Sequence, residues 1–185
     1  MNKFPIPGSG DVTGANDNLF AHMERVIGFV PNIYAVFAHS ARALPALMCL
    51  EGMPSVFNEK EKTAVNLVVS QVNGCRYSLS AHTQLAIELG LTELDIMEIR
   101  SGFSTLSSRI DALVKLAQSI AVNRGWPGPG LIAAFFREGY SKAALMEMIV
   151  LIGASTITNY AYAITQVPID FPVAPALSAV PSNLL

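Results

Sequence analysis

The feature that most limits the fold of this chain is the spacing of its apolar residues, which follows a helical period along almost its whole length. Between residues 58 and 167 apolar positions recur three or four apart, and no stretch alternates cleanly with the period of two that is typical of a strand. Turn residues such as Asn73-Gly74 separate the runs, and no linker-like composition interrupts them. The pattern therefore predicts an all-α, single-domain helical bundle.

The two ends of the chain differ from this central region. Residues 1–15 are polar and rich in Pro and Gly, without the apolar core of a signal peptide, and residues 168–185 carry four prolines. We expect a helical domain over residues 16–167, an N-terminal arm over 1–15 and a Pro-rich C-terminal arm over 168–185 that lies on a surface.

The composition is apolar for a chain of 185 residues. Hydrophobic residues make up 51% and charged residues 14%, which is more apolar surface than one helical core requires. We therefore expect a homo-oligomer, with the helix over residues 141–166 and the arms at its interfaces. The apolar stretch 143–167 contains polar residues, so we interpret it as a buried or subunit-facing helix and expect no membrane span. The net charge of −2 and the lack of a Lys/Arg run argue against nucleic acid as a partner.

The cysteines and histidines are few. Cys49 and Cys75 make no disulfide framework, so a cytoplasmic location with reduced thiols is expected. Cys49 lies in an apolar run, for which a place in the core is the favoured interpretation. Three histidines without a His-x-x-x-His pair predict no metal site.

Cys75, Ser78 and His82 form the candidate site. They lie three and four residues apart, on one face of a helix that is expected to begin near Gly74. Free N–H groups in the first turn of a helix stabilise a thiolate, and a histidine on the same face can transfer protons. The alternative is structural, because cysteine is among the most buried residues and histidine often caps a carbonyl.

The segment 69–83 that contains these residues resembles the core of the carboxymuconolactone decarboxylase superfamily, and most closely its alkylhydroperoxidase D-like, peroxidase-related branch. The Asn-Gly-Cys-x-Tyr-x-x-x-x-His pattern is the most specific part of the resemblance. Supporting similarity extends from about residue 16 to 172 and includes residues 27–32, 90–92, 99–102, 158–160 and 167–170.

The resemblance implies an all-helical fold that assembles as trimers or hexamers and reduces hydroperoxides with thiols. In redox-active members a Cys-x-x-Cys pair opens the site helix: the second cysteine attacks the peroxide, and the first resolves the sulfenic acid to a disulfide. An external dithiol or a redox partner protein then reduces that disulfide, and no bound cofactor is needed. A histidine and a glutamate on the preceding helix relay protons.

This chain departs from that pattern at two positions. Cys75 matches the resolving cysteine and His82 the relay histidine, but Ser78 stands at the position of the attacking cysteine and Thr63 at that of the relay glutamate. Glu61 lies two residues away, about 200° around a helix, and is better explained as the capping-box partner of Asn58. A serine hydroxyl forms neither a sulfenic acid nor a disulfide, so weak or absent peroxidase activity is expected.

Two other functions remain open from the sequence. One is a decarboxylase- or isomerase-like enzyme that acts on a small lactone or acid and uses His82 for proton transfer, with Arg76 as the one nearby arginine. The other is a non-catalytic oligomeric binding protein with a closed apolar site. Asn159, Tyr160 and Tyr162 either line a pocket or pack at an interface.

Overall fold

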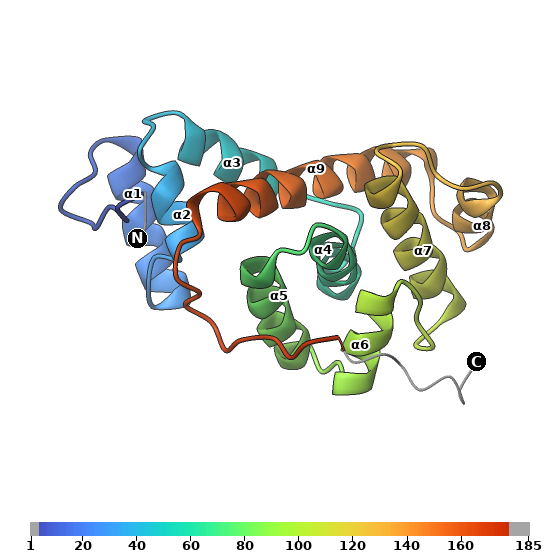
Figure 1. The fold of residues 1–185 in the computed structure, drawn as a ribbon. Helices are drawn as coiled ribbons and strands as arrows, with labels where there is room; N and C mark the ends of the chain where they lie inside the picture. The colour runs from blue at the N-terminus through green and yellow to red at the C-terminus, as the bar shows by residue number, and fades with distance from the viewer. Residues whose placement is uncertain (1–3, 178–185) are drawn as a thin grey trace.

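A computed structural model describes residues 4–177 of the chain, and every regular element in that part is an α-helix (Figure 1). This confirms the prediction of an all-α fold. The helices of the described residues are α1 (Ala15–Ile27), α2 (Asn32–Phe37), α3 (Ala43–Glu51), α4 (Glu59–Val72), α5 (Arg76–Glu88), α6 (Glu93–Ser101), α7 (Ser108–Val122), α8 (Leu131–Arg137) and α9 (Lys142–Thr165).

Helix α4 is the centre of the fold and is seen almost end-on in the middle of Figure 1. Helices α5, α6, α7 and α9 all pack against it. Its apolar residues therefore meet neighbours on several sides, and Leu67 and Val68 are fully buried together with Leu113 of α7 and Met148 of α9. A helix surrounded in this way needs apolar residues around most of its circumference, as the sequence of α4 has.

Helices α1, α2 and α3 form a separate lobe beside the end of α9, at the left of Figure 1. The lobe has a small core of its own, in which Phe20 and Met23 of α1 pack against Leu44 of α3. The lobe and the α4–α5–α9 bundle therefore bury two different hydrophobic clusters, and a third cluster, in which Ile33 of α2 packs with Tyr77 of α5, joins them.

The C-terminal arm leaves α9 and runs along α5 toward α6 (Figure 1). The carboxylate of Asp170 accepts hydrogen bonds from the backbone N–H of Asn32 at 2.6 Å and from the hydroxyl of Tyr77. Further along, Arg100 donates to the carbonyl of Pro175 at 2.9 Å. The predicted surface arm is thus packed on the bundle over residues 168–177, and its remainder, 178–185, lies outside the described residues.

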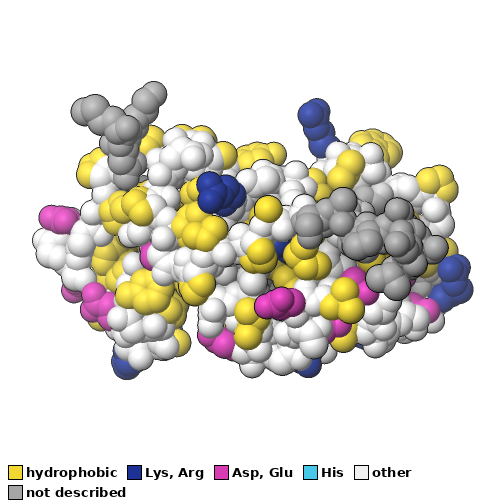
Figure 2. Space-filling view, turned by 60° about the horizontal axis from the view of Figure 1, so that its bottom comes forward, with side chains coloured by type: hydrophobic (Ala, Val, Ile, Leu, Met, Phe, Trp, Pro, Cys, Tyr) yellow, Lys and Arg dark blue, Asp and Glu magenta, His cyan; other side chains and the backbone are white. Residues whose placement is uncertain are grey.

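Helix α9 is the one helix in residues 4–177 that is long and apolar enough to cross a membrane by length and composition alone. Core helices of water-soluble proteins pass the same criterion, and one face of α9, with Met148 and Ile152, is buried against the bundle. Its other face leaves apolar residues such as Ile157 and Ile164 exposed. Exposed hydrophobic side chains also occur on the face drawn in Figure 2, where Lys and Arg stand apart from one another.

The expectation that Cys49 lies in the core is wrong. Cys49 is exposed on α3, whose buried face carries Leu44 and Leu47 instead. The run around Cys49 is apolar on both faces of the helix, so its hydrophobic spacing does not tell the inner face from the outer one.

Candidate functional site

The site begins at the turn between α4 and α5. Gly74 adopts a left-handed backbone conformation, with φ of 64°, which reverses the chain and makes Cys75 the N-cap of α5. The backbone N–H of Ser78 donates to the sulfur of Cys75 at 3.4 Å, and the thiol donates to the Ser78 hydroxyl oxygen at 3.3 Å. Cys75 is only 2% exposed, so this thiol is enclosed by the protein.

Asn159 of α9 completes the contacts of Ser78. Its side-chain N–H donates to the Ser78 hydroxyl oxygen at 2.9 Å, and its carbonyl oxygen accepts from the side chain of Asn73 at 2.9 Å. A serine oxygen has two lone pairs, and here Cys75 and Asn159 donate to it. The hydrogen of the Ser78 hydroxyl is therefore the part of the group that remains available to another molecule.

A cavity of about 930 Å³ opens on the other side of Ser78, between the lobe of α1–α3 and helices α4, α5 and α9. Thr63 of α4 and Ser78 and His82 of α5 line it together. Most of the remaining wall is apolar, from residues such as Ile33 and Leu151. An apolar cavity with a few convergent polar groups is the usual form of a small-molecule site.

His82 is the titratable group among these three. Desolvation by the surrounding protein lowers the pKa of His82 to about 4, so its imidazole is neutral at pH 7. Its Nδ1 atom is buried and has no hydrogen-bond partner. A buried ring nitrogen without a partner is costly, and a ligand that hydrogen-bonds to it would remove that cost.

The lowered pKa of His82 predicts a specific dependence of stability on pH. In the unfolded chain its pKa returns to about 6.5, so unfolding takes up a proton between pH 6.5 and 4. Between pH 7 and pH 4.5 we therefore expect the free energy of unfolding to fall by about 2 kcal/mol more in the native protein than in His82→Asn. Urea titrations at the two pH values measure this. His22→Asn, at an exposed histidine, should follow the native protein, and equal pH slopes for native protein and His82→Asn would contradict the prediction.

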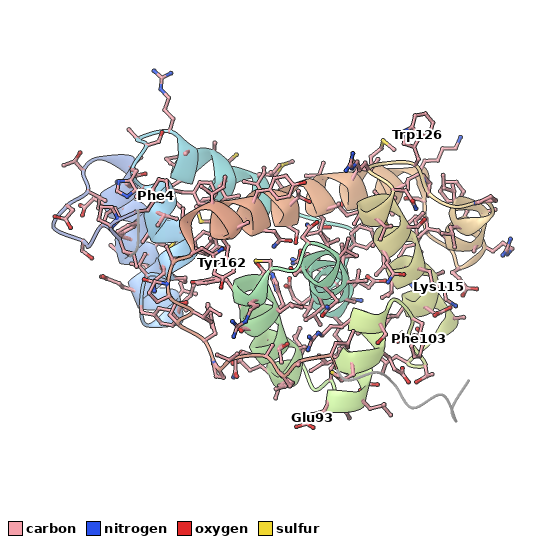
Figure 3. The ribbon with its side chains drawn as sticks, in the orientation of Figure 1. Phe4, Glu93, Phe103, Lys115, Trp126 and Tyr162 are labelled. Atoms are coloured by element: carbon pink, nitrogen blue, oxygen red, sulfur yellow. The ribbon has the colours of Figure 1, made fainter. Side chains whose placement is uncertain are left out.

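The predicted site residues are therefore partly brought together. Thr63, Ser78 and His82 share the cavity, whereas Cys75 lies behind Ser78 and Cys49 is on α3. Glu61 forms the capping box with Asn58, as predicted from the sequence. The contact of Asn159 with Ser78 joins residues 81 apart, and helical spacing carries no signal for such a pair. Tyr160 is exposed, and Tyr162, labelled in Figure 3, packs its ring 5.8 Å from that of Tyr77.

No group of three or more His, Cys, Asp or Glu side chains that could hold a metal ion occurs among residues 4–177. Arginine is also missing from the described lining of the cavity, and Arg76 is exposed on α5. The cation that reaches the cavity is Lys62, which is paired with Glu59 at 2.6 Å. The cavity thus lacks the bidentate group with which proteins usually hold a carboxylate.

Comparison with known proteins relates part of this chain to a protein family. Residues 40–102, which include α4, α5 and α6, match the carboxymuconolactone decarboxylase family. No curated protein matches the chain.

Solved structures with the same fold cover most of the chain. An uncharacterized peroxidase-related protein from Silicibacter sp. TM1040 is 17% identical over 90% of this chain and 89% of its own, with a TM-score of 0.77. An alkylhydroperoxidase AhpD core protein, also described as peroxidase-related, from Ralstonia eutropha JMP134 is 14% identical over 91% and 92%, with a TM-score of 0.81. The debrominase Bmp8, in complex with 2,3,4-tribromopyrrole, is 18% identical over 86% and 90%, with a TM-score of 0.70. At these identities the likeness establishes a shared fold.

Proposed function

We propose that the chain is a member of the carboxymuconolactone decarboxylase superfamily, that its cavity binds a small, largely apolar substrate, and that it has little or no two-thiol peroxidase activity. The match of residues 40–102 to that family and the fold shared with alkylhydroperoxidase D-like structures support this. The observation that carries the proposal is the place of Ser78. Ser78 lines the cavity at the position where a nucleophile is expected, while the nearest thiol, Cys75, is buried, is absent from the lining and contacts the Ser78 hydroxyl.

The chemistry of the two groups supports the reduced peroxidase activity. Reduction of a hydroperoxide requires a thiolate to attack the O–O bond, which converts sulfur to a sulfenic acid and releases an alcohol. A second thiol then displaces water from the sulfenic acid and forms a disulfide, which an external dithiol reduces. A serine hydroxyl at the attacking position performs neither step, and Cys75 has Ser78 rather than a thiol as its partner.

The proposal is tested by restoring the missing thiol. With cumene hydroperoxide and a dithiol reductant, we expect native turnover near background and at least a roughly tenfold gain in Ser78→Cys, because the new thiol would lie in the cavity, three residues from Cys75. Cys75→Ser in the Ser78→Cys background is the control and should reduce the gain, since the sulfenic acid formed at position 78 can then be resolved only by the external dithiol.

Two results would count against this account. Efficient turnover by the native protein that Cys75→Ala removes would show that one thiol suffices. An inert Ser78→Cys would mean that Thr63 at the relay position also limits the reaction, and the double variant Ser78→Cys/Thr63→Glu then decides whether the cavity supports peroxide chemistry at all.

A second candidate function is proton transfer to or from a bound substrate by His82. The observation that favours it is a neutral imidazole in the cavity with an unpartnered Nδ1 atom. The absence of an arginine from the described lining argues against a carboxylate substrate of the decarboxylase type. An uncharged ring such as the tribromopyrrole of the debrominase complex is a better model compound for the cavity.

A further inference from the structure

We propose that the site cavity selects an amphipathic organic cation, such as an aryl-alkyl amine, over uncharged and anionic molecules of the same shape. The inference rests on the proposed function, in which this cavity is the substrate site. It follows from the charges around the cavity, the aromatic rings in its wall and the unpartnered nitrogen of the lining residue His82.

Acidic side chains outnumber basic ones around the cavity by five to one. The carboxylates come from five different elements and are Glu51, Glu59, Glu88, Glu147 and Asp170, and the one cation is Lys62. Because Lys62 pairs with Glu59 at 2.6 Å, its charge is already matched. Four carboxylates therefore face the cavity without a positive partner in its described lining.

Uncharged donors hold these four carboxylates in place. Tyr34 donates to Glu51 at 2.8 Å, and Gln84 donates to Glu88 at 2.9 Å. In the same way Ser55 and the backbone N–H of Val56 donate to Glu147, while Tyr77 donates to Asp170. Hydroxyl, amide and backbone donors fix the position of a carboxylate but leave its charge uncancelled, so the potential in the cavity favours a cation.

Aromatic side chains supply the surface for the apolar part of such a ligand. Phe29, Tyr77 and Phe171 line the cavity, and the ring of Phe171 lies 5.7 Å from each of the other two. An aromatic wall packs against an alkyl or aryl body, and ring faces also attract ammonium groups.

His82, which lines the cavity, gives a second, independent indication of a ligand with N–H donors. The buried Nδ1 atom of His82 has no partner, and in the tautomer that leaves it unprotonated it accepts hydrogen bonds only. An ammonium group carries donors and no acceptor, so it matches both this nitrogen and the carboxylates. A carboxylate ligand has only acceptors and would meet the like charge of the four unmatched carboxylates.

The experiment compares three ligands with the same phenyl body and polar groups of different charge: 2-phenylethylamine, 2-phenylethanol and phenylacetate, titrated calorimetrically at pH 8. Burial raises the pKa of Glu51 to about 7, so at pH 8 its carboxylate is ionised. We expect the amine to bind about tenfold more tightly than the alcohol, and phenylacetate to bind most weakly.

Variants link the selectivity to the cavity. Glu88→Gln and Glu51→Gln should each weaken amine binding several-fold and leave alcohol binding unchanged, because each removes one charge and little volume. Glu93→Gln is the matched control: Glu93, labelled on α6 in Figure 3, is exposed and is not part of the cavity lining, so its loss should change nothing. Circular dichroism identifies a variant that fails to fold. If Glu51→Gln does not fold, Glu88→Gln alone provides the test.

The outcomes separate the two proposals. If the alcohol binds as tightly as the amine, or phenylacetate binds best, charge selection is wrong and the cavity remains a binding site. If Glu93→Gln weakens the amine as much as Glu88→Gln does, the preference reflects net protein charge and the inference fails. If none of the three ligands binds, the cavity is not a site for molecules of this size and the proposed function fails with it.

Discussion

Replacing Glu61 with alanine is expected to lower the free energy of unfolding by about 3 kcal/mol, a large change for one residue outside the apolar core. The Glu61 carboxylate is buried and accepts three hydrogen bonds. The donors are the backbone N–H of Asn58 at 3.0 Å, the hydroxyl of Tyr140 at 2.7 Å and the side chain of Arg109 at 3.1 Å.

Removal of the carboxylate leaves each donor without its acceptor. The hydroxyl of Tyr140 is buried, so its lost bond carries the full desolvation penalty. The N-cap of α4 loses half of its capping box at the same time. Arg109 stacks over the ring of Tyr140, at 3.8 Å from its centroid, and would lose the anion that holds it there.

Two variants bracket the effect. Glu59→Ala removes an acid from the same helical turn, but Glu59 is exposed and pairs with Lys62 at the surface, so a change of at most about 0.5 kcal/mol is expected. Glu61→Gln keeps the shape of the side chain and should fall between the two. Urea unfolding at pH 7 measures all three, and a loss for Glu61→Ala no greater than that for Glu59→Ala would show that the cluster is energetically unimportant.

The sequence predicted the helices well because local features determine them. The capping boxes at Asn58–Glu61 and Thr92–Asp95 start α4 and α6, and Gly74 separates α4 from α5. Such signals act within a few residues, so they are visible in the sequence without knowledge of the tertiary contacts.

The site was predicted less completely because its contacts are long-range. Helical spacing placed Ser78 and His82 on α5, but the meeting of Ser78 with Asn159 depends on how α9 crosses α4 and α5. The same holds for the hydrogen bond from Tyr77 to Asp170, which are 93 residues apart in the sequence. Hydrophobic spacing also gave a wrong prediction for Cys49, which has apolar neighbours in the sequence but is exposed in the structure.

The exposed face of α9 has the spacing of a helix–helix seam. Positions 146, 150, 153, 157, 160 and 164 follow one another at intervals of four and three residues, and all are apolar, Gly or Tyr. Three of them are large and well exposed in the single chain: Met146, Tyr160 and Ile164. A 4-3 repeat of this kind is the pattern with which two helices pack side by side.

We propose that this face joins identical subunits into the homo-oligomer expected from the composition, which the family resemblance implies is a trimer or hexamer. The double variant Ile157→Glu/Ile164→Glu should then convert the oligomer to a species of 19.8 kDa in light scattering at micromolar concentration, because each glutamate would be buried without a partner at the interface. Ile164 is 68% exposed in the single chain, so its replacement costs the isolated fold little.

Val122→Glu is the matched control, because Val122 is an exposed apolar residue at the end of α7, outside the α9 face. It should leave the native mass unchanged. A native protein that is already 19.8 kDa would refute the oligomer, and an oligomer that survives the double substitution would place its interface elsewhere.

Since Asn159, which holds Ser78, lies on the buried side of the same helix, loss of subunit contacts through Ile157 and Ile164 should leave the Ser78→Cys gain in turnover intact. A parallel loss of that gain would mean that the cavity needs the assembled α9 face to keep its shape.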